Sequence, residues 1–548
     1  MLPRVFFSLV CLFPVFVHVA EVARADDVRD LQTEAIETKK AAFGHWGWDR
    51  NNYMAWGTHS NRLIPVYTFG TAGQGPGISL KSYQGENSPY ASKEKIEKLY
   101  GYLPEGTYHP NPPYFDQTNI FDIQKAALDA GKKHIILVVF DGTDWQTTFA
   151  ASTYKNNGVK YTSGRGTGLH VQDYTANGTT EFGWMVTSPY CDDVDVDVDT
   201  QTVSNVEKAM RGGYAYEIAG EYPWSQPTDL KYLISKSEDK KYQHQYTDSS
   251  TSASSMTTGT KSYNASINVL PDGTQVPTIA MLAQEKGYRI GVVTSVPISH
   301  ATPSAAYSHN VHRDDYQDLT RDLLGLPSVS HPDNPNPGVD LLIGCGYGVE
   351  RTKDNGQGKN FVPGNAYLTD EDMQKADVRN GGKYIIATRT SGVLGREELK
   401  EKAREAIEGN HRLLGFFGTK YGHLPFQTAD GRYDPTVGRK KTAEAYSEND
   451  LKENPKLYEM TEVALDYLGR DSKPFWLMVE AGDVDWANHD NNIDNSIGAF
   501  LSGDAAIKTI TDWVEKNSSW DETVMIVTAD HGHLLVLERP ELLVSGEK

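Results

Sequence analysis

The chain alternates short, wholly apolar segments with segments of helical periodicity, and this pattern constrains the fold more than any other feature. The apolar segments are HIILVVF from His134, RIGVVTSV from Arg289, DLLIGCG from Asp340, YIIATR from Tyr384, FWLMVEAG from Phe475 and TVMIVTADHG from Thr523. They lack polar–apolar alternation, so we expect strands that are buried on both faces. Helical patterns lie between them, for example after Arg396 and Lys456. The sequence therefore predicts an α/β fold, a three-layer α/β/α sandwich with a large, mostly parallel central sheet.

Residues that can bind metals follow four of these strands. Ligands of open α/β sheets collect at the carboxyl ends of the strands. The candidate residues there are Asp141, His300, Thr302, Glu480, Asp485, His489, Asp530 and His531. Asp485 and His489 share one face if a helix begins there. Each residue alone could be a helix cap, a turn former or a structural histidine. Together they predict a centre for several ions, with zinc on histidine and carboxylate and magnesium on oxygen ligands.

Ser249 is the candidate nucleophile. It lies in the tract TDSSTSASSMTTGTKSYN, which begins at Thr247 and could by composition be a flexible linker. Its small residues would also let a helix pack closely. A serine at a helix start faces free backbone N–H groups and the positive end of the helix dipole, and both suit a phosphate group. Arg313 could bind two phosphate oxygens through its guanidinium group.

These motifs resemble those of the alkaline phosphatase family. The tract around Ser249 resembles the nucleophile segment, and Asp141-Gly142 resembles the first metal motif, although Thr143-Asp144 stand where the family usually has Met-Gly. The other matching segments are HATP from His300, Glu480 with Asp485 and His489, and TADH from Thr528. Arg313 falls at the position of the phosphate-binding arginine. The resemblance covers the strands from His134 onward.

The resemblance implies three metal ions. One zinc would be bound by Asp485 and His489. A second zinc would be bound by Asp141, Asp530, His531 and, during turnover, Ser249. The third ion, assigned as magnesium although the sequence leaves its identity open, would be bound by Asp141, Thr302 and Glu480. The resemblance places three further residues around these ligands: Asp248, His300 and Trp486. His533 matches none of the family's ligand positions and is interpreted as a neighbour of the ligands.

The first zinc has one protein ligand fewer than the usual three. The family supplies that ligand from a histidine after TADH, whereas this chain has no histidine after His533. The segment THSNRLIPVYTFG, from Thr58 to Gly70, resembles the missing motif, and DQTNIFDIQKAAL from Asp116 resembles the family's closing helix. We therefore predict that His59 is the missing ligand and that the chain is circularly permuted, with residues 40–131 as the moved segment. The strand Ile64 to Phe69 should then lie beside the strands after His531. The alternative is a surface histidine in a truncated chain.

The resemblance implies a metal-dependent phosphomonoesterase. Phosphate monoesters would be hydrolysed to an alcohol and inorganic phosphate through a phosphoserine intermediate. Three rival functions remain. A phosphodiesterase would usually lack the Thr302 and Glu480 ligand set, and a sulfatase needs a motif that this chain lacks. A noncatalytic metal-dependent binding protein would have no need of an activated nucleophile.

Composition limits the partners and the location. A formal charge of −20 and a pI near 5.3 argue against a nucleic-acid partner. Arg4, an apolar run to about Ala20 and the sequence Ala23-Arg24-Ala25 predict a signal peptide over residues 1–25. We therefore expect a secreted or periplasmic protein without a membrane span. Residues 26–548 should form a single catalytic domain, and a homodimer is left open.

The sequence leaves the role of one long polar segment and the pairing of two cysteines undecided. The polar segment from Gln146 to Lys241 is interpreted as an insertion near the active site. Its acidic run, Asp192 to Asp199, could bind calcium but is better interpreted as a solvated acidic edge. Cys191 and Cys345 could pair if their geometry allows it.

Overall fold

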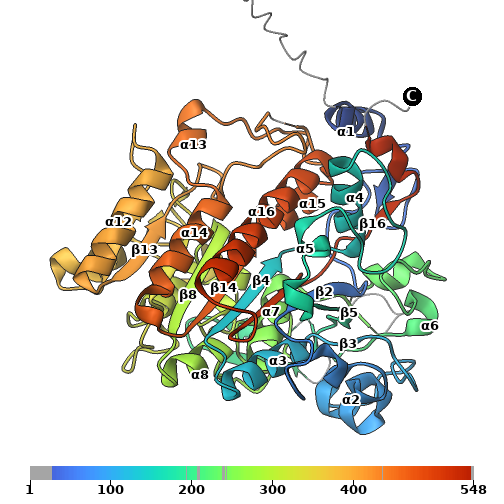
Figure 1. The fold of residues 1–548 in the computed structure, drawn as a ribbon, viewed down its shortest axis with the longest axis horizontal. Coiled ribbons are helices and arrows are strands. Elements are labelled where there is room, and N and C mark those ends of the chain that lie inside the picture. Colours follow the sequence, from blue (N-terminus) through green and yellow to red (C-terminus); the bar gives the residue numbers. More distant parts are fainter. Residues whose placement is uncertain are drawn as a thin grey trace, which may run out of the picture.

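The computed structural model describes residues 27–192, 194–206, 210–236, 241, 244–434 and 436–544. The predicted signal peptide, residues 1–25, lies outside the described residues. The centre of the molecule is a ten-stranded sheet with the strand order β12-β13-β9-β8-β14-β4-β15-β2-β5-β3 (Figure 1). In this order, the strands are Tyr384–Thr388, Arg412–Phe416, Leu341–Cys345, Arg289–Pro297, Phe475–Ala481, His134–Phe140, Thr523–Thr528, Ile64–Phe69, Glu181–Val186 and Phe115–Asp116.

The sheet is mostly parallel, as predicted. β2 pairs antiparallel with β15 on one side and with β5 on the other. The other pairings within this sheet are parallel. Strands β4, β8, β14 and β15 are buried at every position, because helices cover both faces of the sheet.

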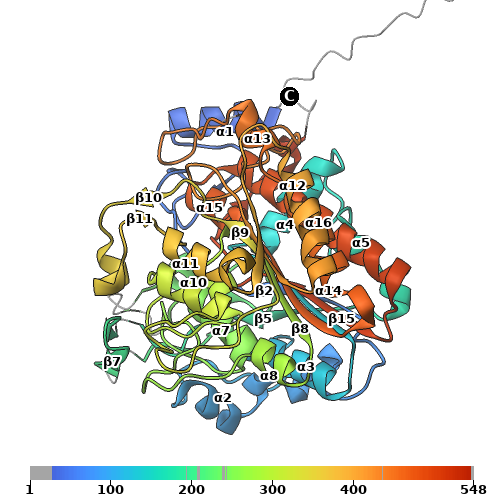
Figure 2. The same ribbon diagram turned by 90° about the vertical axis from the view of Figure 1, so that its left-hand side faces the viewer.

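Helices form a layer on each side of the sheet, which completes the predicted three-layer α/β/α sandwich (Figure 2). One layer contains α4 (Trp145–Lys155), α5 (His170–Asp173), α12 (Gly395–Gly409), α14 (Leu457–Leu468) and α16 (Ile493–Asn517). The other contains α3 (Thr118–Asp129), α7 (Ser249–Thr258), α8 (Ile279–Glu285) and α9 (Ala301–Ala305). The predicted helices after Arg396 and Lys456 are α12 and α14.

Shorter elements surround this framework. The helices are α1 (Asp27–Thr38), α2 (Lys93–Tyr100), α6 (Tyr216–Ala219), α10 (Tyr316–Leu324), α11 (Asp370–Ala376), α13 (Glu448–Lys452) and α15 (Asp483–His489). The strand pairs are β1 (Gly44–Trp46) with β16 (Leu535–Leu537), β6 (Asp195–Asp197) with β7 (Thr202–Ser204), and β10 (Glu350–Arg351) with β11 (Gly364–Asn365).

The strand Ile64–Phe69 lies next to β15, which precedes His531, and not next to the strands after it. The prediction was wrong on this point. The strand that follows His531 is β16, and it pairs with β1. Both pairings nevertheless place the segment before Asp141 against the segment around His531. An isolated bridge between Ser60 and Gly532 joins the same two segments.

The segment from Gln146 to Lys241 contributes to the central framework. It supplies β5 to the central sheet, and its α4 and α5 pack against α16. Its polar composition concealed β5, which is only half-buried at three of its six positions. The acidic run includes β6, where Asp197 accepts a backbone hydrogen bond from Asp199. Asp199 also pairs with Lys359 at 3.1 Å.

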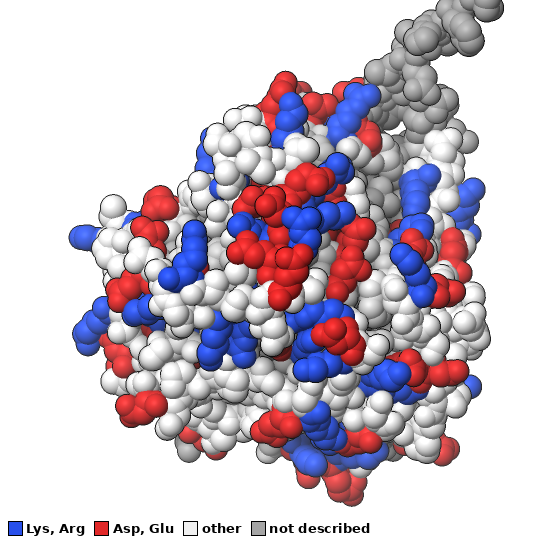
Figure 3. Space-filling model, turned by 60° about the vertical axis from the view of Figure 1, so that its left-hand side comes forward, with Lys and Arg blue, Asp and Glu red and all other residues white. Residues whose placement is uncertain are grey.

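The structure also describes the two cysteines, the lengths of the helices and the surface charge, on which the sequence led to expectations. Cys191 and Cys345 are both buried and unpaired. None of the helices in the described ranges combines the length and apolarity needed to cross a membrane. Acidic and basic side chains are interspersed over the face drawn in Figure 3.

Candidate active site

Parallel register brings the predicted site residues to one edge of the sheet. Val139 of β4 lies opposite Glu480 of β14 and opposite Thr528 of β15. The three strands therefore end at the same level. The residues that follow them, Asp141 and Asp530 among them, are placed side by side.

Ser249 is the first residue of α7, so the Ser/Thr-rich tract is a helix and not a linker. Asp248 caps this helix, and its Oδ1 accepts a hydrogen bond from the backbone N of Thr251 at 3.1 Å. Every residue of α7 is buried. The Ser249 hydroxyl donates to Asp141 Oδ1 at 3.3 Å and lies 3.1 Å from His531 Nε2.

Asp141, Asp530 and His531 form a fully buried cluster beside Ser249. His531 Nε2 lies 3.3 Å from Asp141 Oδ1 and 3.5 Å from Asp530 Oδ2. Asp141 Oδ2 and Asp530 Oδ2 have no hydrogen-bond partner among the described residues. Burial and the neighbouring Asp530 raise the pKa of Asp141 well above its usual value, and burial raises that of Asp530 to about 6. Unpaired buried carboxylates are costly, so this cluster fits a cation.

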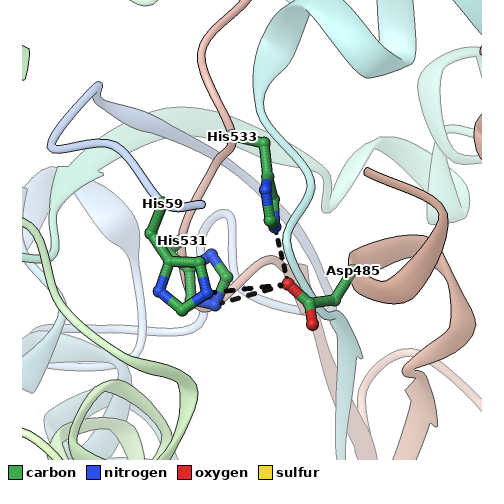
Figure 4. A group of neighbouring side chains, drawn as sticks. All are labelled: His59, Asp485, His531 and His533. Atoms are coloured by element: carbon green, nitrogen blue, oxygen red, sulfur yellow. Dashed lines mark hydrogen bonds and ion pairs between the residues drawn. The ribbon is translucent and has the colours of Figure 1, made fainter. Parts of the chain in front are cut away.

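A second cluster contains His59, Asp485, His531 and His533 (Figure 4), and His489 lies beside it. Asp485 and His489 lie on α15, as the four-residue spacing predicts, with His489 Nε2 3.5 Å from Asp485 Oδ2. His59 Nε2 lies 3.2 Å from His489 Nε2 and 3.8 Å from Asp485 Oδ1. The His59 ring therefore lies beside the Asp485 and His489 side chains.

Backbone carbonyls determine which nitrogens of this cluster are free. His59 Nδ1 donates to the carbonyl of Thr247 at 2.9 Å, and His489 Nδ1 donates to the carbonyl of Gly57 at 2.6 Å. Because a carbonyl can only accept, the facing Nε2 atoms both carry lone pairs. Burial lowers the pKa of both histidines, which keeps these rings neutral. Two facing lone pairs repel unless a cation lies between them, so this cluster also fits a metal ion.

His533, which was not expected to be a ligand, contacts Asp485 directly. Its Nε2 is 2.6 Å from Asp485 Oδ1, and its side chain is buried. The alternation His531-Gly532-His533 could have suggested that two imidazoles reach one centre. The contact fixes the orientation of the Asp485 carboxylate.

Thr302 and Glu480 form the third predicted ligand set together with Asp141. Glu480 Oε2 accepts a hydrogen bond from Thr294, whereas Oε1 is buried without a hydrogen-bond partner among the described residues. Burial raises the pKa of Glu480 to about 8. Thr302 lies on α9 and is fully buried. The set offers oxygen ligands only, which suits magnesium.

Arg313 lies in the same cavity as Ser249 and is held by Asp248. Its Nη1 donates to Asp248 Oδ2 at 2.9 Å, and its Nη2 lies 3.5 Å from His300 Nε2. Burial would raise the pKa of Asp248, but the guanidinium group and the accepted hydrogen bonds lower it to about 2. Burial and Arg313 lower the pKa of His300 to about 3. The Trp486 ring lies 5.6 Å from that of His300.

These residues surround a cavity of about 530 Å³. Its inner wall includes His59, Ser249, His300, Arg313, Trp486 and His489. Its outer wall comes from the segment between β13 and α13, with Phe426, Lys440 and Tyr446. Sequence reasoning missed this segment, because it has neither periodicity nor a metal-binding motif. None of the described residues from 146 to 241 lines the cavity.

The fold and the site define a three-layer α/β/α protein with buried groups of candidate metal ligands beside a serine that begins a helix. A family model described as alkaline phosphatase matches residues 221–542. This is more than half of the chain, and the chain belongs to the alkaline phosphatase family.

Individual relatives are distant. Alkaline phosphatase 3 of Bacillus subtilis is 28% identical over 287 residues, covering 52% of this chain and 49% of the relative. The alkaline phosphatase of Gadus morhua is 29% identical over 271 residues, covering 48% and 50%. The chain thus spans about half the length of these curated relatives. Among solved structures, the alkaline phosphatase from the Antarctic bacterium TAB5 is 19% identical, with a TM-score of 0.43, covering 73% of this chain and 80% of that one.

Proposed function

We propose that the protein is a secreted or periplasmic alkaline phosphatase that hydrolyses small-molecule phosphate monoesters through a phosphoserine at Ser249. One observation carries this proposal. The Ser249 hydroxyl, at the start of α7, lies within 3.3 Å of Asp141 and His531 and shares a cavity with Arg313. The proposed nucleophile, a group of candidate metal ligands and a cation suited to phosphate oxygens therefore lie together.

The residues fit two zinc ions and one magnesium ion. His59, Asp485 and His489 would hold the first zinc, and Asp141, Asp530 and His531 the second. Asp141, Thr302 and Glu480 would hold magnesium. When bound, the ions would supply Lewis acidity, neutralising phosphate charge and favouring the deprotonated hydroxyl of Ser249.

The chain's own groups would position the phosphate. The start of α7 presents backbone N–H groups and the positive end of its dipole to the phosphate oxygens. Arg313 would donate to two of these oxygens, and Asp248 holds its guanidinium in place at 2.9 Å. The leaving group must depart opposite the attacking Ser249 oxygen. His59 and His489 line the same cavity as Ser249.

The reaction would proceed in two displacements. Ser249 Oγ forms a bond to phosphorus, and the bond from phosphorus to the alcohol oxygen breaks. The alcohol leaves with a proton. Water then attacks phosphorus, the bond to Ser249 Oγ breaks, and inorganic phosphate is released with the serine restored.

Ser249→Ala tests the nucleophile. We expect steady hydrolysis of p-nitrophenyl phosphate to disappear while the zinc content stays at the wild-type value. Ser255→Ala is the matched control, because Ser255 lies on the same buried helix and its hydroxyl donates to the Thr251 carbonyl. Mass spectrometry of acid-quenched enzyme should find phosphate on Ser249, and phosphate trapped on another residue would overturn the assignment.

The same assay separates the rival functions. We expect p-nitrophenyl phosphate to be cleaved much faster than its bis ester and its sulfate, with activity lost to a chelator and restored by zinc and magnesium. Faster cleavage of the bis ester would favour a diesterase. A protein that binds zinc but cleaves none of the three would favour the noncatalytic function.

We further propose that residues 40–131 are a permuted segment. Two observations support it: His59 reaches the Asp485 and His489 pair, and β2 pairs with β15 although it precedes β4 in the chain. A rearranged chain that carries residues 27–131 after residue 544 should retain the fold and p-nitrophenyl phosphate hydrolysis. The adjacency of β1 and β16 makes this join short.

The proposed export and assembly need separate measurements. N-terminal sequencing of the exported protein should begin at Asp26 if residues 1–25 are a signal peptide. Light scattering would decide whether the protein is a homodimer.

A further inference from the structure

Three metal-binding side chains converge outside the cavity that contains Ser249. They are His309, which lies between α9 and α10, Asp322 on α10, and His331 in the loop 328–338. Each offers one ligand atom, and these atoms all lie within 4.8 Å of one another. The proposed phosphatase reaction uses none of them.

His309 presents a free lone pair inside the protein. The residue is only 5% exposed, and its Nε2 donates to the carbonyl of Val276 at 2.9 Å. The other nitrogen, Nδ1, therefore carries the lone pair. It is buried and has no hydrogen-bond partner among the described residues. A ring held by a carbonyl on one nitrogen and open on the other is the arrangement typical of a metal-ligating histidine.

Asp322 supplies a buried negative charge beside this lone pair. It is fully buried and accepts hydrogen bonds from the His309 backbone N at 2.9 Å and from Ser328 Oγ at 2.5 Å. No lysine or arginine pairs with it in the described part of the chain. His331 Nδ1 lies 2.9 Å from its Oδ1. A divalent cation would compensate this charge and satisfy His309 at the same time.

We propose that His309, Asp322 and His331 form a zinc site separate from the catalytic centre. Two imidazole nitrogens and one carboxylate oxygen are an established ligand set for zinc, with a fourth position left for water. Ligands at about 2.0–2.1 Å from a tetrahedral ion are about 3.3 Å apart, so the three groups need only a small closure. The His331 side chain is 14% exposed, which gives the ion a path from solvent.

The site would have a structural role. It joins the loop 328–338, which contains three prolines, to α10 and to the segment that precedes Arg313. Arg313 follows His309 by four residues. An ion here would stabilise the position of that segment without touching the substrate.

The test is the zinc content of the purified full chain, measured after zinc loading and removal of free metal. The variant is His331→Asn, because the asparagine amide can replace Nδ1 as donor to Asp322 but offers no nitrogen lone pair to zinc. The matched control is His411→Asn, a half-buried histidine outside the metal-ligand clusters of the described residues. We expect the wild type and the control to hold one zinc per chain more than His331→Asn. His331→Cys, which keeps a zinc ligand, should restore that zinc.

Equal zinc content in all four proteins would overturn the proposal. The contact between His331 and Asp322 would then be a hydrogen bond only. Anomalous scattering from wild-type crystals at the zinc edge gives a measurement that needs no variant. A peak among His309, Asp322 and His331 supports the site, and zinc peaks confined to the catalytic centre reject it. Because both measurements count metal and not turnover, they are independent of the proposed phosphatase function.

Discussion

Replacing Arg313 with alanine removes the only positively charged side chain that contacts the helix-capping Asp248 among the described residues. The guanidinium group donates to Asp248 Oδ2 at 2.9 Å and lines the cavity beside Ser249. The substitution should leave the fold intact, because the side chain faces the cavity and is not packed in the core. It should remove the clamp that binds two phosphate oxygens.

The expected loss of kcat/KM in Arg313→Ala has two causes. One charge-stabilising donor at a transition state contributes about 2.7–4 kcal/mol, or roughly 10²–10³ in rate. Arg313 also neutralises Asp248, whose pKa is lowered to about 2. Without Arg313, this carboxylate stays ionised at neutral pH and repels the incoming phosphate. We therefore expect kcat/KM to fall by about 10³, the upper end of that range.

A double variant separates the two causes. Arg313→Ala combined with Asp248→Asn removes the unpaired charge, so it should be more active than Arg313→Ala alone. The assay measures kcat/KM for p-nitrophenyl phosphate and the inhibition constant of inorganic phosphate. Arg351→Ala, at a partly exposed arginine that pairs with Asp354, is the control. Unchanged phosphate inhibition in Arg313→Ala would refute the reasoning.

Three further predictions follow from the metal centre. His59→Ala should lose one zinc per chain and at least a hundredfold in activity, because residues that contact the ion directly matter more than their hydrogen-bond partners, whose loss costs about 10–100-fold; an unchanged zinc content would exclude His59 as a ligand. Activity should rise from pH 6 to pH 9, because Asp530 and Glu480, with pKa values of about 6 and 8, must lose protons to bind ions; a maximum near pH 5 would contradict this. Metal-free protein should become less stable to urea from about pH 5 to about pH 8, because folded Glu480, whose pKa is raised to about 8, keeps a proton that the unfolded chain releases at lower pH. Stability should fall by up to about 1.4 kcal/mol per pH unit for that group. Added zinc and magnesium should reduce this dependence, and a urea midpoint that rises with pH in chelator would show the sign to be wrong.

The local hydrophobic pattern of the sequence was sufficient to predict most strands of the central sheet. The six predicted strands all lie in the central sheet, because an uninterrupted apolar segment is stable only where both faces are covered. The helical positions of Asp485 and His489 followed from their spacing, since the period of a helix is a local property. β5 was missed for the opposite reason. It lies near the edge of the sheet with partly exposed faces, so its sequence is too polar to stand out.

The candidate site depended on the resemblance as well as on pattern. Asp141 and Asp530 follow strands, and their convergence was predictable from a parallel sheet. The outer wall from Phe426 to Tyr446 was not predictable, because an irregular segment takes its path from the surfaces that it covers. The position of β2 beside β15, and not beside the strands after His531, required the actual pairing of the sheet.

The sequence by itself determined which chemical groups are present, the sheet that positions them and the helix that begins at Ser249. Each of these depends on neighbours within a few residues or one turn. Only the tertiary structure decided that His59 meets His489, 430 positions away, with both Nε2 lone pairs facing each other at 3.2 Å. It also raised the pKa of Glu480 and left His309 Nδ1 without a hydrogen-bond partner among the described residues. The pKa of a buried side chain and the tautomer of a histidine depend on the backbone carbonyls and charges around them. Those groups come from distant parts of the sequence, and only folding brings them together.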